Sequence, residues 1–386
     1  FAGPSAQAVA AMGSKVEARR IARAAGVPVV PGFDAAGADA AAIAAAAEQL
    51  GFPVLVKASA GGGGRGMRRV DRADDLASAL TSARAEAGTA FGDATVFLEK
   101  LIDNPRHIEV QVFGDGQGGA LHFHERDCSV QRNHQKIIEE APAPNLPDAI
   151  RTQLFDHALT LTRTIRYAGA GTVEFILGRE SDVPFFLEMN TRLQVEHPVT
   201  EAICGVDLVE WQLRQAAGLP LPLTQGQIMP RGHAIEVRLN AERPDQGFIP
   251  ATGQVIDLVA PRGLRLDTGV APGSEISVHY DSMIAKLIAH GPTREDARAR
   301  LLSGLEALAL PGIATNQAFL ADCLRAPAFM EAGATTGFLA ENFGGGWQPA
   351  PGALHALRLG AARAALPPGG TPHNRTDAFR VTGRPG

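Results

Sequence analysis

The sequence predicts an α+β protein in which most strands pair as antiparallel hairpins. Two strand patterns at 107–128 flank the glycine-rich turn at 114–119, which is a hairpin signature. Helical patterns separate groups of strands and do not alternate with single strands, so a regular βαβ order is not expected. The chain has 386 residues, of which 45% are hydrophobic, and this length suits two or three domains with buried cores.

Each expected element has a local signal. Ser5, Ser14 and Asp39 each precede a helical pattern, and such side chains cap the first backbone N–H groups of a helix. The expected helices are 6–12, 15–25, 40–50, 71–87, 148–167, 293–309 and 316–324. The expected strands are 53–57, 67–70, 95–100, the hairpin at 107–128, 171–177, 185–189, 232–239, 254–259 and 283–289. From residue 344 a glycine- and proline-containing stretch predicts a linker into a further domain.

Composition excludes several classes of function. The formal net charge is −5, from 36 basic and 41 acidic residues, so we expect neither a nucleic acid nor an anionic membrane as a partner. The sequence has no run of about 18 apolar residues, the length that spans a bilayer. Cys128, Cys204 and Cys323 lie far apart, as in a protein of a reduced compartment. Because the first residue is Phe1, we expect the chain to begin inside a longer gene product.

The glycine-rich loop at 61–66 lies between two strand patterns. It does not match a dinucleotide fingerprint, which needs a helix after the glycines, and Met67 stands where the Walker lysine would be. Its bare backbone N–H groups suit a flap that closes over a polyphosphate. Lys57, at the end of the preceding strand, would point an ammonium at the same phosphates. A mobile hairpin tip without a ligand is the alternative.

Polar and apolar residues alternate after Phe186. The polar ones are Glu188, Asn190, Arg192, Gln194 and Glu196. If the segment is extended, all five lie on one face, and Pro198 would end the strand. The alternative is the solvated outer face of an antiparallel sheet, although two amides and a guanidinium are unusual for a generic wet face.

Two further groups of residues add to this set. Glu174 lies in the strand that the turn would bring alongside, and with Glu188 and Asn190 it offers oxygen ligands of the kind that magnesium prefers. The polar run at 125–136 would supply cations and donors for phosphate, with a surface loop as the alternative. Cys128 in that run is expected to serve packing, because no adjacent base activates it.

Three segments, KASAGGGGRGM, ERDCSVQRNHQK and EMNTRLQVEHPVTE, together resemble the biotin carboxylase component of biotin-dependent carboxylases, an ATP-grasp family. The likeness extends from GPSAQAVAAMGSK near the start to HYDSMIAKLIAHG, about residues 1–343. It implies an ATP-grasp fold without its Rossmann-like N-terminal domain. The implied parts are linker helices at 1–30, an ATP lid at 31–100, a C-terminal domain with an antiparallel sheet at 101–343, and at 344–386 a linker with the start of the following domain.

The resemblance also assigns site residues. It implies that ATP is bound by Lys15, Lys57, Gly61, Gly62, Gly63, Gly64, Glu99, Lys100, Leu101, His107, Gln131 and His134. Magnesium or manganese would be held by Glu174, Glu188 and Asn190, and bicarbonate by Lys136, Arg192, Gln194 and Val195. Glu196 would be the general base, and Arg238 would stabilise the biotin enolate. Departures from the family pattern at Asn133, Arg243 and Asn240 touch none of these roles.

The implied reaction is the ATP- and bicarbonate-dependent carboxylation of biotin through carboxyphosphate. The end of the chain is similar to α subunits of acyl-CoA carboxylases, with 3-methylcrotonyl-CoA favoured over geranyl-, propionyl- or acetyl-CoA. Expected partners are a biotin carboxyl carrier domain and a carboxyltransferase β subunit in a hetero-oligomer. The compartment would be the cytoplasm of a bacterium or the mitochondrial matrix of a eukaryote. A catalytically silent scaffold subunit is the alternative from another class.

Overall fold

The structure is a computed structural model that describes residues 1–59, 67–179 and 181–350. The glycines at 61–64 and most of the expected linker, 351–386, lie outside these residues. The chain divides into two units. The first contains residues 1–237, 288–300 and 325–344, and the second contains 238–287, 301–324 and the chain from 345. The pairings among the strands of the two sheets described below are antiparallel, and consecutive strands such as β5 and β6 form hairpins, as the sequence predicts.

Two capped helices open the first unit. They are α1 (Ala6–Gly13) and α2 (Lys15–Ala24). The Ser5 hydroxyl accepts from the N–H of Ala8 at 3.2 Å, and the Ser14 hydroxyl accepts from the N–H of Glu17 at 3.4 Å. Both predicted caps are confirmed.

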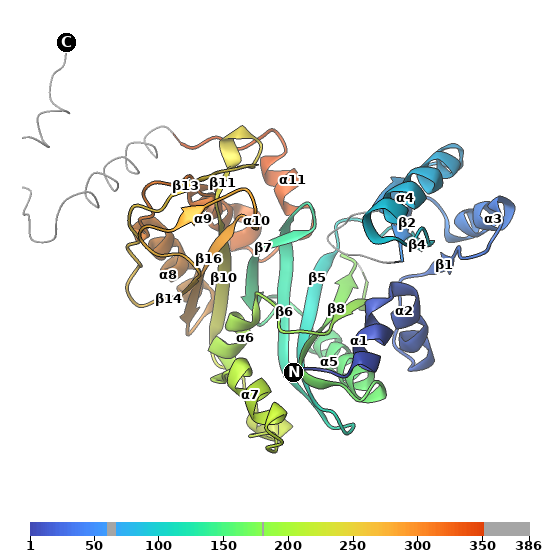
Figure 1. The fold of residues 1–386 in the computed structure, drawn as a ribbon, viewed down its shortest axis with the longest axis horizontal. Helices are drawn as coiled ribbons and strands as arrows, with labels where there is room; N and C mark the ends of the chain where they lie inside the picture. The colour runs from blue at the N-terminus through green and yellow to red at the C-terminus, as the bar shows by residue number, and fades with distance from the viewer. Residues whose placement is uncertain (60–66, 180, 351–386) are drawn as a thin grey trace, which may run out of the picture. The chain divides into compact units, whose positions relative to one another are not determined.

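A small four-stranded sheet follows, with its own core. Its strands, in the order β1-β4-β2-β3, are β1 (Gly32–Asp34), β4 (Val96–Lys100), β2 (Val54–Ala58) and β3 (Met67–Val70). Helices α3 (Ala40–Leu50), capped by Asp39, and α4 (Leu76–Phe91) lie beside these strands (Figure 1). Ile43, Leu80, Val54 and Leu98 pack together in the core. The alanine-rich composition of both helices lets them approach the short strands closely.

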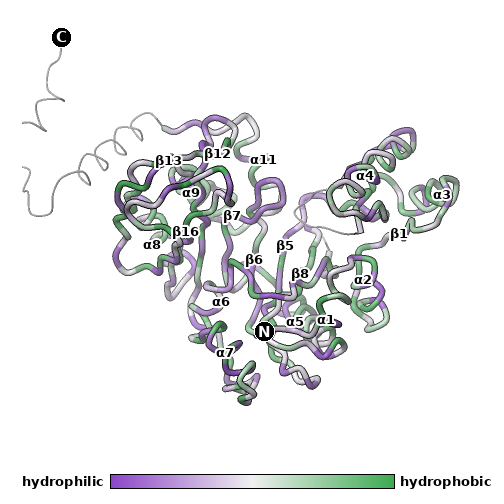
Figure 2. Tube along the Cα trace, viewed as in Figure 1, coloured by the Kyte–Doolittle hydropathy of each residue, from purple (hydrophilic) through white to green (hydrophobic). Residues whose placement is uncertain are grey.

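The large sheet of the first unit has the order β10-β7-β6-β5-β8-β9. Its strands are β5 (Arg106–Asp115), β6 (Ala120–Arg132), β7 (Gln135–Ala141), β8 (Ala168–Leu177), β9 (Phe185–Asn190) and β10 (His233–Asn240). Figure 2 marks hydrophilic stretches along β5 and β6. Because side chains alternate faces along a strand, each of these strands presents an apolar row and a polar row.

Helix α5 (Asp148–Thr164) covers the apolar row. Leu154 and Ala158 of this helix share a core with Ile108 and Val110 of β5 and Phe175 of β8. The polar row of the same strands is therefore left for the other face of the sheet. That face carries the candidate site.

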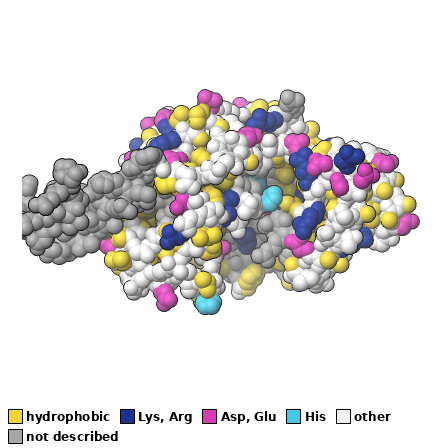
Figure 3. All heavy atoms as spheres, turned by 90° about the horizontal axis from the view of Figure 1, so that it is seen from above, with side chains coloured by type: hydrophobic (Ala, Val, Ile, Leu, Met, Phe, Trp, Pro, Cys, Tyr) yellow, Lys and Arg dark blue, Asp and Glu magenta, His cyan; other side chains and the backbone are white. Residues whose placement is uncertain are grey.

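Two helices and several short elements complete the first unit. These are α6 (His197–Cys204), α7 (Leu208–Ala216), the first part of α8 (Arg294–Ala307), α10 (Pro327–Met330) and α11 (Phe338–Phe343). Trp211 of α7 packs edge-on against Phe113 and Phe123 of the large sheet. Within the described ranges, no helix is long and apolar enough to cross a membrane. Charged side chains of both signs are interspersed on the face shown in Figure 3.

The second unit contains short strands and the helix α9 (Gln317–Arg325). Its strands are the end of β10, β11 (Glu242–Arg243), β12 (Ile249–Pro250), β13 (Gly253–Gln254), β14 (Arg265–Thr268), β15 (Glu275–Ile276) and the start of β16 (Met283–Gly291). The strand expected at 254–259 is shorter than predicted: only Gly253–Gln254 is a strand, and Val259 forms an isolated bridge with Ala309.

The structure excludes one alternative and corrects one prediction on the polar segments. The alternative of a surface loop at 125–136 is excluded, because the run forms most of β6 and the start of β7, joined by a tight turn at Asn133 and His134. The extended segment predicted up to Glu196 ends at Asn190. Pro198 does not end a strand but lies in the first turn of α6, a position where its missing N–H costs no hydrogen bond.

Candidate active site

Lys136 binds three carboxylates from three different elements. Its Nζ lies 2.5 Å from Oε2 of Glu109 on β5, 2.8 Å from Oε1 of Glu174 on β8 and 2.6 Å from Oε1 of Glu196 before α6. Lys136 is the second residue of β7, so the sheet brings it beside Glu109 and Glu174, and the residue before α6 adds Glu196. A buried ammonium with three carboxylate partners forms strong, charge-assisted hydrogen bonds.

Arg126 is a second cation beneath this cluster, and it is completely buried. Its Nε donates to Oε1 of Glu109 at 2.6 Å. Its Nη1 donates to Gln111 and to Thr200 of α6, both at 2.8 Å. The guanidinium thus fixes Glu109 from the side opposite Lys136 and ties α6 to the sheet.

Glu174 gathers the amides that the sequence analysis singled out. Its Oε1 accepts from Asn190 Nδ2 at 2.9 Å and from Gln194 Nε2 at 3.0 Å. Its Oε2 lies 3.0 Å from Nε2 of His107. Glu188 stands directly opposite Glu174 in the β8–β9 register, so the neighbouring position predicted for these two carboxylates is confirmed.

The charges shift several pKa values. Burial alone would lower the pKa of Lys136, but Glu109, Glu174 and Glu196 raise it well above its usual range. Burial would raise the pKa of Glu109, but Lys136 and Arg126 lower it to about 2. The pKa of Glu174 is lowered in the same way, by Lys136 and His107 against burial. Lys136, Glu109 and Glu174 are therefore ionised at neutral pH.

Glu188 behaves differently from the other acids. Burial and the facing charge of Glu174 raise its pKa. It forms a long ion pair with Lys15, whose Nζ lies 4.0 Å from Oε2 of Glu188. Two ionised carboxylates on directly opposed strand positions, such as Glu174 and Glu188, repel one another unless a cation neutralises them. Glu174, Glu188 and the nearby Asn190 thus form an oxygen-rich donor set that fits a magnesium ion.

A second acidic group does not fit a metal equally well. Ligand atoms of His107, Glu109 and Glu174 lie within 4.8 Å of one another. Lys136 and Arg126 already neutralise Glu109, however. A cation there would be repelled by both.

Residues 191–196 reach the cluster by a turn and not along a strand. Gln194 and Glu196 arrive at Glu174 and Lys136, but Arg192 is exposed, with its Nη2 donating to Oδ1 of Asn190 at 3.3 Å. Val195 is half-buried in the same turn. The face expected from strict alternation therefore holds only for Glu188 and Asn190.

The small sheet contributes a separate ionic group. Glu99 of β4 forms ion pairs with Lys57 of β2 and with Arg19 of α2, and all three side chains are buried. Burial, together with Lys15 and Arg19, lowers the pKa of Lys57 to about 7, while the charge of Glu188 acts in the opposite direction. A phosphate group beside Lys57 would restore its positive charge.

Lys100 and Leu101, two of the residues expected at a nucleotide, lie at the end of β4. The backbone N–H groups of Lys100 and Leu101 donate to the carbonyls of Pro31 and Pro53, at 2.8 and 3.2 Å. The Lys100 ammonium donates to the Gly51 carbonyl at 2.7 Å. These three bonds tie the strand end into its own sheet.

His107 and Gln131 are buried neighbours, with Gln131 Nε2 2.7 Å from Nδ1 of His107. His134 is exposed on the β6–β7 turn, and burial of part of its ring together with Lys57 and His107 lowers its pKa. The turn of the large sheet is thus electrostatically coupled to the lysine of the small sheet. Arg238 belongs to the second unit.

Three residues that the structure brings into these groups were not predicted as site residues: Glu109, Arg126 and Arg19. A signal for Glu109 exists, because His107, Glu109 and Gln111 alternate with apolar residues along one strand. Arg126 lies in the polar run but has no partner near it in sequence. Only the sheet order shows what it contacts.

Comparison with known proteins agrees with this arrangement. A family model, the carbamoyl-phosphate synthase L chain ATP binding domain, matches residues 14–224, and the biotin carboxylase C-terminal domain matches 236–341. Biotin carboxylase 2 of Bacillus subtilis is 47% identical over 89% of this chain and 77% of its own length. The α subunit of mitochondrial methylcrotonoyl-CoA carboxylase of Arabidopsis thaliana is 50% identical over 83% of this chain and 44% of its own length.

Solved structures give the same result. Biotin carboxylase from Campylobacter jejuni, solved as a β,γ-ATP complex, superposes with a TM-score of 0.85 at 43% identity and covers 89% of this chain. The biotin carboxylase domain of Hydrogenobacter thermophilus 2-oxoglutarate carboxylase, solved with MgADP and bicarbonate, gives a TM-score of 0.85 at 41% identity. The chain spans about half the length of the methylcrotonoyl-CoA carboxylase subunits it matches. It has the ATP-grasp fold and belongs to the biotin carboxylase family.

Proposed function

We propose that this chain carboxylates biotin with ATP and bicarbonate, through carboxyphosphate, as the first half-reaction of an acyl-CoA carboxylase. The observation that carries the proposal is the buried contact of Lys136 with Glu196, beside Glu174 and Gln194. It places one cation, one amide and one carboxylate base side by side, and the Gln194 and Glu196 side chains are buried. This combination can hold a small anion and remove its proton.

Bicarbonate would lie beside Lys136, Arg192, Gln194 and the Val195 backbone. It is a poor nucleophile, so loss of its proton to Glu196 accelerates its attack on ATP. The ammonium of Lys136, held by three acids, is already oriented and needs no reorganisation when negative charge develops. Arg192 is exposed and is therefore the bicarbonate ligand that can swing in with the substrate.

The nucleotide would lie against the small sheet. Lys15 and Lys57 would bind its phosphates, with the glycines at 61–64 folding over them, and Glu99, Lys100, Leu101, His107, Gln131 and His134 would surround the base and ribose side. A lid is needed because carboxyphosphate hydrolyses in water. We propose residues 31–100 as this lid, after linker helices at 1–30 and before the C-terminal domain at 101–343.

Magnesium would be held by Glu174, Glu188 and Asn190. When bound, it supplies positive charge that neutralises the phosphates of ATP. Carboxyphosphate would then collapse to carbon dioxide and phosphate, and the phosphate would take the ureido N1 proton of biotin. Arg238 would stabilise the resulting enolate.

The biotin would be carried by a carrier domain, and the carboxyl group would pass to a carboxyltransferase β subunit. Methylcrotonoyl-CoA is the favoured acceptor, because several of the relatives are methylcrotonoyl-CoA carboxylase α subunits. Geranyl-, propionyl- or acetyl-CoA are the alternatives. Relatives named as mitochondrial and relatives from bacteria support a matrix location in a eukaryote and a cytoplasmic one in a bacterium.

The proposal is tested by Glu196→Gln in the complete protein. Loss of a general base costs roughly 10²- to 10⁴-fold in rate, so bicarbonate-dependent ATP hydrolysis should almost vanish, and likewise in Lys136→Ala. A catalytically silent scaffold predicts no change in either variant. An acyl-CoA panel assayed with the cognate β subunit identifies the acceptor.

A further inference from the structure

Asn316 fixes the backbone that directly follows Arg238 within the second unit. Its Nδ2 donates to the carbonyl of Arg238 at 3.1 Å, and its Oδ1 accepts from the N–H of Asn240 at 2.9 Å. The backbone N–H of Asn316 donates to the Asn240 carbonyl at 3.1 Å. Asn316 is only 2% exposed, so water does not compete for these bonds.

These bonds reproduce the pattern of a neighbouring strand. The register of β10 with β7 runs from Ala234 to Val237, and residues 238–240 follow directly. One donor and one acceptor from a single side chain, with a backbone donor beside them, give 238–240 the alternating bonds of a strand pair. Asn316 thus takes the place of a partner strand for the part of β10 from Arg238 to Asn240.

Helix capping does not explain this use of Asn316. The residue directly precedes α9, where an asparagine usually accepts from N–H groups of the first helical turn. Here Oδ1 is engaged by Asn240, and the first N–H of the helix, that of Gln317, goes to the Thr315 hydroxyl at 3.4 Å. Both the nitrogen and the oxygen of the Asn316 amide are hydrogen-bonded to β10.

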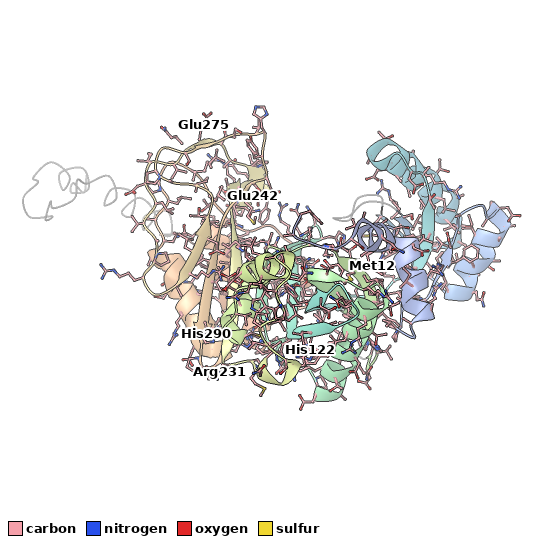
Figure 4. The ribbon with its side chains drawn as sticks, turned by 60° about the horizontal axis from the view of Figure 1, so that its bottom comes forward. Met12, His122, Arg231, Glu242, Glu275 and His290 are labelled. Carbon is pink, nitrogen blue, oxygen red and sulfur yellow. The ribbon has the colours of Figure 1, made fainter. Side chains whose placement is uncertain are left out.

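A second set of bonds holds the chain just beyond. Asn240 Nδ2 donates to Oε1 of Glu242 and to the Ser282 hydroxyl, both at 3.2 Å. The Ser282 hydroxyl donates to the same Glu242 oxygen at 2.9 Å. Glu242, in β11, is labelled in Figure 4. The backbone that follows Arg238 is therefore anchored from two sides.

We propose that Asn316 is a positioning residue for Arg238 in biotin carboxylation, an inference that rests on the function proposed above for Arg238. A long guanidinium side chain is aimed by the backbone that carries it. Misplacement of a reacting group by about 1 Å can cost roughly 10²-fold in rate. The pairing of Val237 with Ile138 holds the backbone before Arg238, and Asn316 holds the backbone after it. The guanidinium is thereby kept in place without a contact between Asn316 and biotin.

The test is Asn316→Asp in the complete protein. This change keeps the shape but removes the Nδ2 donor and places a carboxylate oxygen against the Arg238 carbonyl. Carboxylation of free biotin should fall by roughly 10²-fold, while bicarbonate-dependent ATP hydrolysis without biotin is retained. Asn316→Ser, which keeps one hydroxyl donor and acceptor, should lie in between. Equal loss of both activities, or loss of neither, would overturn the inference.

Gln317→Glu provides a matched control. It makes the same amide-to-acid change one residue later, and its Nε2 donates to the carbonyls of Leu305 and Leu308, at 2.5 and 2.9 Å. None of these bonds touches β10. Both activities should be retained. If Gln317→Glu reproduces the selective loss of Asn316→Asp, the effect is general to this helix and the inference is wrong.

Arg238→Gln separates this inference from the proposed function. If Asn316 acts through Arg238, adding Asn316→Asp to Arg238→Gln lowers biotin carboxylation no further. Full additivity of the two losses contradicts the inference alone. If Arg238→Gln by itself leaves biotin carboxylation unchanged, the role proposed for Arg238 fails and the inference fails with it.

Discussion

Lys136 and Arg126 balance the buried acids at the centre of the first unit. Glu109 lies between them, bonded to Lys136 through one oxygen and to Arg126 through the other. If either cation is removed, Glu109 loses the charge partner of one of its two buried oxygens. At the scale of single residues, the pocket is therefore held in shape by charge, and the same charges orient the groups proposed to act on bicarbonate.

Arg126→Met is expected to lower the free energy of unfolding by about 3–5 kcal/mol, the usual cost of leaving one member of a buried ion pair alone. Arg126 also donates to Gln111 and Thr200, so their oxygens lose a partner as well. The thermal midpoint of the complete protein measures the change.

Arg68→Met is the comparison for Arg126→Met. Arg68 pairs with Glu86 at 2.7 Å on the surface, where an ion pair contributes about 0–1 kcal/mol. Its midpoint should stay close to the parent. Equal shifts for the two variants would show that the buried network contributes no more than a surface pair.

At the scale of elements, Glu140 of β7 joins four parts of the first unit. Its Oε2 lies 2.7 Å from Nε2 of His233, at the start of β10, and accepts from Nε of Arg294, in α8, at 2.6 Å. Arg294 also donates to the carbonyl of Phe329 in α10 at 2.8 Å. One buried carboxylate therefore connects two strands to two helices that lie far apart in the sequence.

This contact predicts a pH dependence. Burial would raise the pKa of Glu140, but hydrogen bonds from His233 and Arg294 lower it below its ordinary value. A lowered carboxyl pKa stabilises the folded state above the unfolded pKa, about 4.3, and this stability is lost as the pH falls through the folded value. Glu140→Gln should therefore lower the thermal midpoint at pH 7. At acid pH the thermal midpoints of the variant and the parent should lie closer together.

Glu295→Gln serves as the control for Glu140→Gln. Glu295 is exposed and bonds Arg298 within α8. Its replacement should change the midpoint little at either pH. A difference between parent and Glu140→Gln that is constant with pH would contradict the assignment of this contact.

The whole molecule shows what could be predicted from sequence. Both serine caps, the β5–β6 hairpin and the pairing of Glu174 with Glu188 follow from short-range signals: caps, turn residues and period-two alternation. The turn at 191–196 could not be predicted in this way. The alternation of polar and apolar residues continues beyond the end of the strand, and Pro198 suits the start of a helix as well as the end of a strand. Arg126 and Glu109 were missed because their partners come from strands that only the sheet order brings together.

Binding of magnesium and ATP should stabilise the first unit as a whole. A ligand at a hundred times its Kd adds about 2.7 kcal/mol to stability, so MgATP should raise the thermal midpoint of the complete protein. Glu188→Gln should have two opposite effects. Without ligand it should not destabilise the protein, since burial and Glu174 raise the pKa of Glu188 and its charge opposes folding at neutral pH.

With MgATP the same variant should lose most of the rise in thermal midpoint, because Glu174 is then the one carboxylate of the proposed site that remains beside Asn190. Chelation of magnesium should reduce the rise in thermal midpoint of the parent to that of the variant. The thermal midpoint of the variant should not change on chelation. Glu86→Gln, on the surface of the small sheet's helix α4, is the control and should keep the parent's response. A Glu188→Gln protein that is destabilised without ligand yet responds fully to MgATP would remove Glu188 from the proposed metal site.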